Sequence, residues 1–487
     1  MNVVSTPQSR CRAGVSRGDI TPPAGIYHRM WGAALHDRAT GIHRPLEATV
    51  LWMEPLEAAQ GRPQVVVALD HCILDTGEQT RIRQATAEAT DLTVDRVLVS
   101  LSHTHGSGWM SRTRADLPGG ELIGPYLDSL AQTIPRLARE AQQSAAPATF
   151  VYGIGRCALA AQRDYLDVER GQFVCGFNPT GPADDTLLVA RVTNAAGTLL
   201  ATVVNYACHP TTLAWENTLI SPDWVGAMRE TIEHSTGCPC LFLQGASGDL
   251  GPREGFVGDP AVADRNGRQV GYAVLSTLAG LPPAGTEYRY VGPVLSGATI
   301  GVWQHQPLAP ATLERQAAWH WEQLTVELPY RHDLPTVEQT TAERDHWLAE
   351  ETRARTAGDH DRLRQCRAEA ERRTRQLARL SSLSAGRTHA LTVQLGVLGD
   401  ALWISLPGEY YQIFQQQLRQ RFAPRPVIVA TLTNAWQPGY FPAASSYGYG
   451  IYQEVISAMA PGCLETLIES LARRIQELPS APVVTSR

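Results

Sequence analysis

The chain has 487 residues, of which 43% are hydrophobic and 18% are charged, a balance typical of a folded globular protein rather than a disordered one. Its formal net charge is −6, so binding through phosphate neutralisation has no support and no nucleic-acid partner is expected. All 42 basic residues are arginine. The absence of lysine excludes Schiff-base enzymes and P-loop nucleotide hydrolases, because both depend on a lysine amine.

The location predicted for the chain is cytoplasmic. Its first residues lack the apolar core of a secretory signal, and no apolar run approaches the roughly 20 residues that a membrane-spanning helix needs. The nine cysteines are odd in number and scattered, which predicts free, mostly buried thiols in a reducing compartment. Cys238 and Cys240 form Cys-Pro-Cys, which is not a zinc-ribbon spacing, so no metal site is expected there.

Apolar strands alternate with amphipathic helices over residues 64–250. Strands are predicted at 64–70, 95–102, 148–159, 185–193, 198–208 and 240–244. Helices are predicted from near Gly77, around 122–143, and after Ser221-Pro222-Asp223, where the Ser221 hydroxyl has the position of a cap. This alternation predicts an α/β fold with a layered mixed β-sheet core flanked by helices.

The composition changes after about residue 308. Residues 341–380 include 10 arginines and 8 acidic residues, with only a thin apolar stripe. This pattern predicts an exposed, charged helical insertion near 309–385, with a partner-binding arm as the alternative. The chain is then one catalytic domain spanning 1–487, with an α/β core at 13–308 and the remainder of that core at 386–475.

Polar residues follow several of the predicted strands, where layered α/β folds collect their ligands. His103 and His105 come directly after a strand, and at i, i+2 in extended chain both imidazoles would face one cavity. His209 precedes Pro210, which would make His209 the last residue of its strand. Each histidine alone is more often a hydrogen-bonded structural residue than a ligand.

Glu409 and an aromatic loop complete the candidate residues. Pro407-Gly408-Glu409 reads as a strand-to-helix turn that puts the carboxylate on the first turn of a helix, where it could equally compensate the helix dipole. Residues 439–452 form a glycine-interrupted aromatic loop. Two histidines and one carboxylate from distant segments match the ligand set of an open catalytic zinc site, which activates water at neutral pH.

With these motifs in this order, the chain resembles the catalytic domain of the neutral/alkaline (non-lysosomal) ceramidase family, zinc amidases that cleave an N-acyl bond. The resemblance covers roughly residues 13–460. The segments that carry it are AGVSRGDITPP (13–23), HTH (103–105), NYACHPTT (205–212), SPDWVG (221–226), QGASGD (244–249), PGE (407–409) and the stretch 440–452.

The resemblance implies a function and a set of site residues. One zinc ion per chain would be held by His103, His209, Glu409 and Tyr440. Around the scissile carbonyl it places His105, Arg163 and Tyr452. The implied activity is hydrolysis of a linear amide bond by metal-activated water, with a small-molecule amide of N-acyl or lipid-like type as substrate.

Two departures from the family pattern stand out. The family has a serine just before a proline in its Gly-Asp loop, where this chain has Gly251, so a serine acyl-enzyme at that position is excluded. The chain is also expected to lack the family's C-terminal immunoglobulin-like domain and a signal peptide.

Two other functions stay open at this point. One is a two-metal ester or phosphoester hydrolase, because the sequence offers enough hard ligands for two ions. Those ligands are Asp70, His71, His103, His105, His209 and Asp223. The other is a non-catalytic binding protein on the same scaffold. Metal content distinguishes the first alternative, since two ions per chain would favour it over the amidase.

Overall fold

Two β-sheets packed face to face form the centre of the chain in a computed structural model that describes residues 2–478. The eight-stranded sheet has the spatial order β14 (Cys240–Gln244), β12 (Leu199–Tyr206), β11 (Thr186–Asn194), β7 (Ala146–Arg156), β2 (Gln8–Asp19), β4 (Glu47–Glu54), β5 (Gln64–Leu69) and β6 (Val97–Leu101). Its two outermost pairs are parallel and the rest are antiparallel. The four-stranded sheet has the order β18 (Trp319–Pro329), β19 (Thr388–Leu398), β20 (Ala401–Ser405) and β22 (Val427–Ala430).

Side chains alternate between the two faces of the larger sheet, as the two-residue period of a strand requires. Val65 and Val67 belong to the core between this sheet and the helices α1 (Thr76–Thr90) and α2 (Ile123–Gln143). Val66, between them, belongs to the core shared with the smaller sheet. Because both faces are covered, the strand reads as an unbroken apolar run, which is why the sequence predicts it well.

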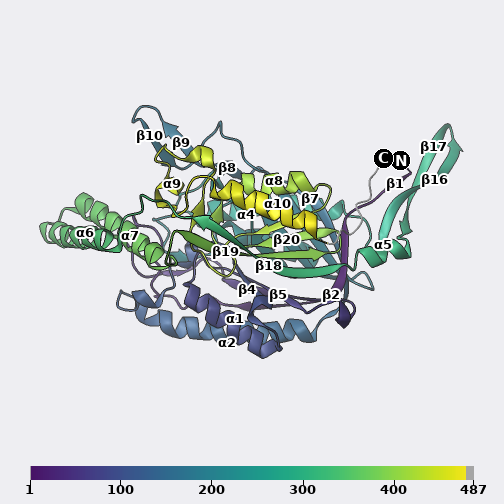
Figure 1. The fold of residues 1–487 in the computed structure, drawn as a ribbon, viewed down its shortest axis with the longest axis horizontal. Coiled ribbons are helices and arrows are strands. Elements are labelled where there is room, and N and C mark those ends of the chain that lie inside the picture. The colour runs from purple at the N-terminus through teal and green to yellow at the C-terminus, as the bar shows by residue number, and fades with distance from the viewer. Residues whose placement is uncertain (1, 479–487) are drawn as a thin grey trace.

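Helices close both outer faces of the two sheets. On the larger sheet, α1 and α2 cover the half that contains β5, and α3 (Trp224–Thr236) and α4 (Pro260–Ala279) cover the half that contains β12. The smaller sheet packs against α8 (Ile413–Phe422) and α10 (Cys463–Glu477). Figure 1 shows α1 and α2 below the sheets and α8 and α10 above them. The predicted α/β fold with a layered mixed β-sheet core is confirmed.

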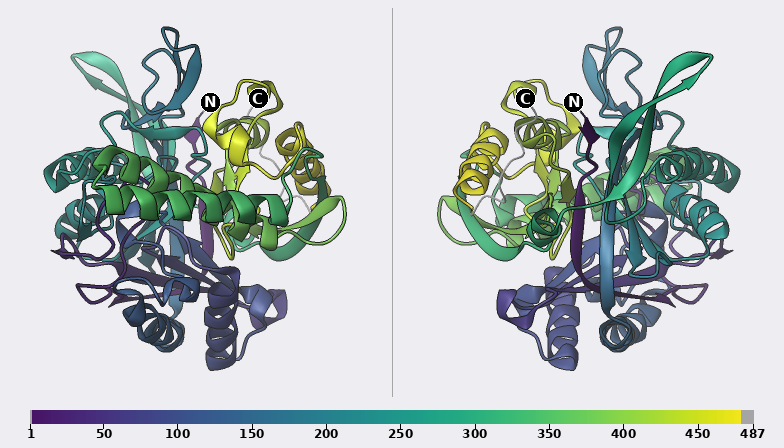
Figure 2. Two further views of the ribbon diagram at one scale, coloured as in Figure 1. Left: turned by 90° about the vertical axis from the view of Figure 1, so that its left-hand side faces the viewer. Right: turned by 90° about the vertical axis from the view of Figure 1, so that its right-hand side faces the viewer.

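The charged segment forms an antiparallel helix pair, α6 (Val337–Ala357) and α7 (His360–Ser381), that projects from the body (Figures 1 and 2). The predicted bounds of this insertion, 309–385, are too wide. Residues 319–329 form β18, which pairs with β19 along its whole length and buries alternate side chains against the core. The helices of the segment are therefore the short α5 (Pro310–Arg315), before β18, and the charged pair that begins at Val337.

A second projection leaves the opposite end of the molecule in Figure 1. It is the hairpin of β16 (Thr286–Ser296) and β17 (Ala298–Pro307). The remaining short elements are β1 (Val3–Val4), β3 (Gly41–Ile42), β8 (Ala160–Gln162), β9 (Asp164–Asp167), β10 (Gln172–Cys175), β13 (Leu219–Ile220), β15 (Leu250–Pro252), α5 (Pro310–Arg315), β21 (Glu409–Tyr410), β23 (Tyr440–Phe441) and α9 (Tyr452–Ile456).

One helix start differs from its prediction. The cap of α3 is Asp223, whose carboxylate accepts from the Trp224 amide at 2.7 Å, and not Ser221. The Ser221 hydroxyl instead accepts from the amide of Asp223 at 2.9 Å. The carboxylate serves as the cap because it lies one residue before the first helical amide.

All nine cysteines are free thiols and eight of them are buried, as the sequence predicts. Cys238 and Cys240 belong to neither of the possible metal-binding groups found among residues 2–478. Within the same residues, no helix combines the length and the apolar character needed to cross a lipid bilayer.

Candidate active site

Three buried side chains from distant elements meet at one point. The Nε2 atoms of His103 and His209 lie 3.2 Å apart, and Glu409 Oε2 lies 3.2 Å from the first and 3.0 Å from the second. The three residues follow β6, β12 and β20, so each comes just after a strand of one of the two central sheets. These three residues are among the metal ligands that the family resemblance implies, and the fold brings them together.

Backbone carbonyls orient both imidazoles. His103 Nδ1 lies 2.8 Å from the carbonyl oxygen of Cys72, and His209 Nδ1 lies 2.7 Å from that of Ser247. A carbonyl can only accept, so each Nδ1 must carry its proton and donate it. In the neutral rings both Nε2 atoms then present lone pairs to the same point, where Glu409 adds a third acceptor.

The charges at this point depend on one another. Burial, with a smaller effect of Arg163, lowers the pKa of His209 to about 4, so this imidazole is neutral at pH 7. Burial alone would raise the pKa of Glu409, but interactions with His103 and His209 outweigh burial and keep it well below its usual range. An ionised carboxylate therefore faces the neutral imidazole of His209. Burial would lower the pKa of His103, but contacts with Cys72 and Glu409 outweigh it and raise that pKa well above its usual range, so a divalent cation that binds here takes the place of a proton on His103.

The two histidines of the His-Thr-His motif approach each other by a route other than the predicted one. His103 has a left-handed backbone with φ of 68°, and His105 begins a 3-10 turn, so the segment is not extended. Thr104 holds this turn, because its hydroxyl donates to the carbonyl of Ser221 at 2.7 Å and accepts from the amide of Gly106 at 3.2 Å. The rings of His103 and His105 nevertheless lie with centroids 5.0 Å apart.

The sequence predicts His209 as the last residue of its strand, but the structure places it beyond the end of that strand. β12 ends at Tyr206, and His209 lies in the loop beyond it, where its amide donates to the carbonyl of Leu250 at 3.2 Å. The chain from Ser247 in the loop after β14 to Leu250 at the start of β15 thus holds His209 through both its amide and its Nδ1. Tertiary contacts, rather than strand pairing, set its position.

Glu409 is likewise not on the first turn of a helix. It lies in the two-residue strand β21, and α8 begins only at Ile413. β21 pairs in parallel with β23, and Glu409 is the direct partner of Tyr440. This pairing brings the Tyr440 hydroxyl to 3.3 Å from His209 Nε2, so all four predicted ligands meet.

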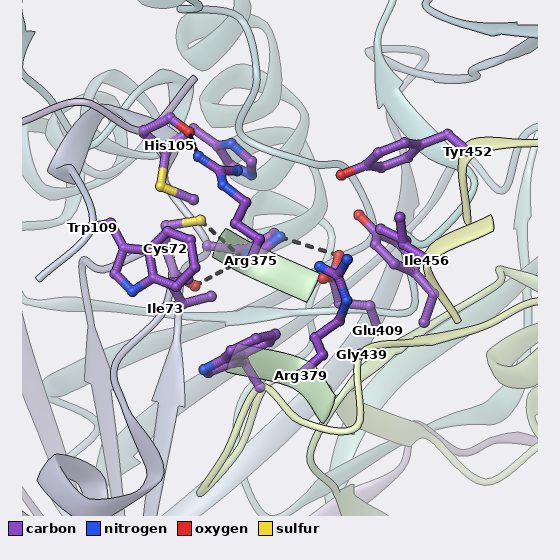
Figure 3. Close-up of a pocket in the computed structure, with 14 residues that line it drawn as sticks. Cys72, Ile73, His105, Trp109, Arg375, Arg379, Glu409, Gly439, Tyr452 and Ile456 are labelled. Carbon is purple, nitrogen blue, oxygen red and sulfur yellow. Dashed lines mark hydrogen bonds and ion pairs between the residues drawn. The ribbon is translucent and has the colours of Figure 1, made fainter. Parts of the chain in front are cut away.

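A pocket opens directly onto this group (Figure 3). Its lining consists of Met30, Cys72, Ile73, His103, His105, Trp109, Arg375, Arg379, Glu409, Trp436, Gly439, Tyr440, Tyr452 and Ile456. Of the residues predicted around the scissile bond, His105 and Tyr452 line it. Arg163 does not; its guanidinium donates to the Tyr440 hydroxyl at 3.0 Å and to the carbonyl of Gly248 at 2.7 Å.

Known proteins offer two kinds of comparison. The chain matches no protein-family profile. A curated neutral ceramidase of Pseudomonas aeruginosa is 25% identical over 250 residues, which are 50% of this chain and 37% of that relative. The chain thus aligns with little more than a third of that relative's length.

Solved structures give the wider match. The crystal structure of neutral ceramidase from Pseudomonas aeruginosa superposes with a TM-score of 0.63 and 17% identity, over 96% of this chain and 74% of that one. A ceramidase complexed with C2 matches with the same score and identity, over 98% and 76%. The chain contains a neutral ceramidase-like domain.

His105 stands out in the ceramidase-like domain because no group among residues 2–478 forms a hydrogen bond with its ring. Both of its ring nitrogens are buried, and neither forms a hydrogen bond within residues 2–478. Burial and the neighbouring His103 and His209 keep its pKa well below the usual range. The lowered pKa keeps this imidazole neutral, so that a free lone pair beside the ligand group can accept a proton, although it also makes the ring a weaker base than an exposed histidine.

Most of the additional ligands that a two-metal site would need are engaged elsewhere in the domain. Asp70 accepts from Arg229 at 3.0 Å, and His71 lies 2.7 Å from the Tyr126 hydroxyl. Asp223 caps α3. Within residues 2–478, the possible metal-binding groups are His103–His209–Glu409 and a second one, Cys72–His103–His105, which shares His103 with the first. The fold therefore does not assemble the predicted two-metal set.

Sequence reasoning missed Arg375 and Arg379, two residues of the pocket in this ceramidase-like domain. Both come from α7, four residues apart and so on one face of the helix. They belong to the charged segment whose composition indicates an exposed pair of helices. Their spacing on α7 was the available signal, but nothing in the sequence shows that this face of α7 meets the site.

Proposed function

We propose that this ceramidase-like domain is a zinc-dependent hydrolase that cleaves a linear N-acyl amide in a small molecule, with one zinc ion per chain. The observation that carries the proposal is the convergence of His103 Nε2, His209 Nε2 and Glu409 Oε2. Because both Nδ1 protons are directed to carbonyls, three atoms at mutual distances near 3 Å need a positive charge among them, and a metal ion can supply it in place of the proton that the raised pKa of His103 otherwise retains.

The spacing of these atoms suits zinc. Tetrahedral zinc binds nitrogen and oxygen at about 2.0–2.1 Å, which places neighbouring ligand atoms roughly 3.3 Å apart. The three separations of 3.0–3.2 Å, and the 3.3 Å between Tyr440 and His209, are close to that value. His103, His209, Glu409 and Tyr440 would hold the ion, which when bound lowers the pKa of water and polarises a carbonyl.

The remaining residues would act on the substrate. His105, neutral and without a partner, takes the proton of the attacking water and passes it to the leaving amine. Tyr452 lines the same pocket and donates to the carbonyl oxygen as negative charge develops there. Loss of one such donor typically costs about 10²–10³ in rate.

Arg163 would support the site from behind Tyr440. Its guanidinium donates to the Tyr440 hydroxyl and also lies over the Tyr440 ring, with 5.5 Å to the centroid. Burial raises the pKa of Tyr440 well above its usual range, and the positive charge of Arg163 opposes this only in part, so Tyr440 would meet the ion as a phenol that Arg163 holds in place. In this arrangement no serine is needed, so Gly251 is compatible with attack by water.

The test combines metal analysis with hydrolysis of N-acyl amides of graded chain length, ceramide among them because the relatives are named ceramidases. We expect one zinc per chain and release of fatty acid that stops on chelation and returns with zinc. A folded, zinc-loaded protein that hydrolyses none of the amides would contradict the proposal. Two metal ions per chain would favour the ester or phosphoester alternative. The cytoplasmic location stays a prediction.

A further inference from the structure

The pocket beside the ligand group contains two cationic side chains that the proposed hydrolysis does not use. Arg375 and Arg379 lie one turn apart on α7, and Figure 3 shows both reaching into the pocket. The only acid in the pocket lining, Glu409, is already held by His103 and His209. The lining therefore has more positive charge than its own acid can balance.

Arg375 is fixed by the protein. Its Nε donates to Glu371 Oε1 at 2.8 Å, and its guanidinium lies 5.0 Å from the Trp109 ring centroid. Glu371 also accepts from the buried Arg114, at 2.9 Å and 3.2 Å. One carboxylate thus serves two guanidinium groups, so this junction of α7 with the body also carries an excess of positive charge.

Arg379 has no such anchor. Within residues 2–478, its guanidinium forms neither a hydrogen bond nor an ion pair, although Glu409, Tyr440 and Tyr452 are its charged or ionisable neighbours. A side-chain carbon at Gly439 would come within 3.7 Å of Arg379 Cδ, which places the arginine beside the loop that leads into Tyr440. A guanidinium stays protonated at neutral pH, so it needs an anion or water.

The end of α7 explains only part of this placement. Arg379 lies in the last turn of α7, where a cation interacts favourably with the helix dipole. The same benefit is available to an arginine that points into solvent, and it does not require a position in the pocket beside Tyr440 and Tyr452. A guanidinium fork directed into a pocket matches the two oxygens of a carboxylate.

We propose that Arg379, with Arg375 behind it, binds a carboxylate of the substrate, so that the domain prefers N-acyl amino acids and similar charged amides to uncharged N-acyl amides. This inference rests on the proposed amide hydrolysis. It also assigns a role to the charged helix pair, which brings the specificity-determining residues to the metal-ligand group.

Two isosteric substrates test the inference. N-octanoylglycine and N-octanoylglycinamide differ only in a carboxylate against a carboxamide. We expect the zinc-loaded full chain to favour the carboxylate in kcat/KM by at least about tenfold. Arg379→Gln should lower kcat/KM for N-octanoylglycine by roughly 10²-fold while changing that for the amide by less than about threefold.

Arg364→Gln is the matched control, because Arg364 is an exposed arginine on the same helix. It should leave both substrates unaffected. Equal use of the two substrates by the unmodified chain, or an equal loss of both in Arg379→Gln, would overturn the inference and leave the hydrolase intact.

If neither compound is hydrolysed, the proposed function fails with these substrates, and binding then decides the role of Arg379. Calorimetric titration of the purified chain with each compound is the measurement. Tighter binding of N-octanoylglycine that disappears in Arg379→Gln would support the carboxylate site. Equal affinity for both compounds, or no binding of either, would refute it.

Discussion

The Nε2 atoms of His103 and His209 lie 3.2 Å apart, although 106 residues separate the two histidines in the chain. Each ring already donates its Nδ1 proton to a backbone carbonyl, so the two Nε2 atoms share either a proton on His103, whose pKa is raised well above its usual range, or another cation. A metal ion between them would replace that proton and use both lone pairs. This pair is the strongest structural reason for assigning a metal to the site.

Replacing one of the two histidines should remove both metal and activity. We expect His209→Ala to lose zinc and to lower kcat for the best amide substrate by more than roughly 10²-fold, because even residues that only orient a ligand cost 10–100-fold. Elemental analysis and turnover are the measurements, with circular dichroism to verify folding. His234→Ala, at an exposed position on α3, is the control and should keep both. Full zinc occupancy in His209→Ala would show that His209 is not a ligand.

The junction of α7 with the body should depend on pH through Glu371. Contacts with Arg375 and Arg114 outweigh burial and lower the pKa of this buried carboxyl to about 2, from an ordinary value of 4.5. Because its pKa is lowered in the folded state, its contribution is complete above about pH 4.5 and is lost as the pH falls toward 2. The difference of about 2.5 pH units corresponds to about 3 kcal/mol.

Glu371→Gln should therefore reduce the free energy of unfolding by about 3 kcal/mol at pH 7, and the gap to the unmodified chain should narrow as the pH falls below 4.5. Denaturant unfolding at a series of pH values measures this. Glu369→Gln, on the same helix but only partly buried, should cost less than about 1 kcal/mol. A gap that is independent of pH would mean that the carboxylate charge does not stabilise the junction.

The proposed metal ligands could be predicted because each belongs to a short motif that carries the resemblance to the ceramidase family. His103 and His209 directly follow apolar strands or lie just beyond them, and such positions collect functional residues in layered α/β folds. Their backbone conformations could not be predicted from the same motifs. The left-handed φ of His103 and the loop position of His209 depend on contacts with segments far away in the sequence.

The positions of Glu409 and of the two arginines of the pocket could not be predicted from local sequence patterns. Glu409 reads as a helix start, but it pairs with Tyr440 in a strand, and no local pattern records a partner that distant. Arg375 and Arg379 lie in a helix with the composition of an exposed one. Only the packing of α7 against the body, which the charge pattern does not encode, shows that one face of it reaches the site.

The backbone before Glu409 should be sensitive to an added methyl group. Gly408 has φ of 90°, and a Cβ there would lie 2.9 Å from the carbonyl oxygen of Gly439. That carbonyl accepts a hydrogen bond from the Glu409 amide at 2.9 Å, so moving the carbonyl away from the added Cβ would disturb the β21–β23 pairing. We expect Gly408→Ala to lower the free energy of unfolding and weaken zinc retention, measured by denaturant unfolding and chelator competition.

Gly448→Ala isolates the effect of that contact. Gly448 has φ of 91°, but a Cβ there has no neighbour within 4 Å, so the two variants share the conformational cost and differ in the clash. The free energy of unfolding should be about 1–3 kcal/mol lower in Gly408→Ala than in Gly448→Ala, and zinc retention should be reduced only in Gly408→Ala. Equal stability of the two variants would mean that the loop of Gly439 moves without cost.

The last prediction concerns the serine that ceramidases have where this chain has Gly251. In β15 a Cβ at this position would meet nothing closer than Thr211 Oγ1 at 3.7 Å and Arg163 Cδ at 3.9 Å, so the added carbon fits without displacing backbone. We expect Gly251→Ser to change the free energy of unfolding by less than about 1 kcal/mol. It should also leave kcat within about twofold, because attack by water has no step that a hydroxyl at this position would assist. Gly251→Ala adds the same carbon without the hydroxyl and should behave alike. A burst of acyl-enzyme, or a rise in kcat of tenfold or more that is specific to the serine variant, would show that the hydroxyl can take part in the reaction and that the water mechanism is incomplete.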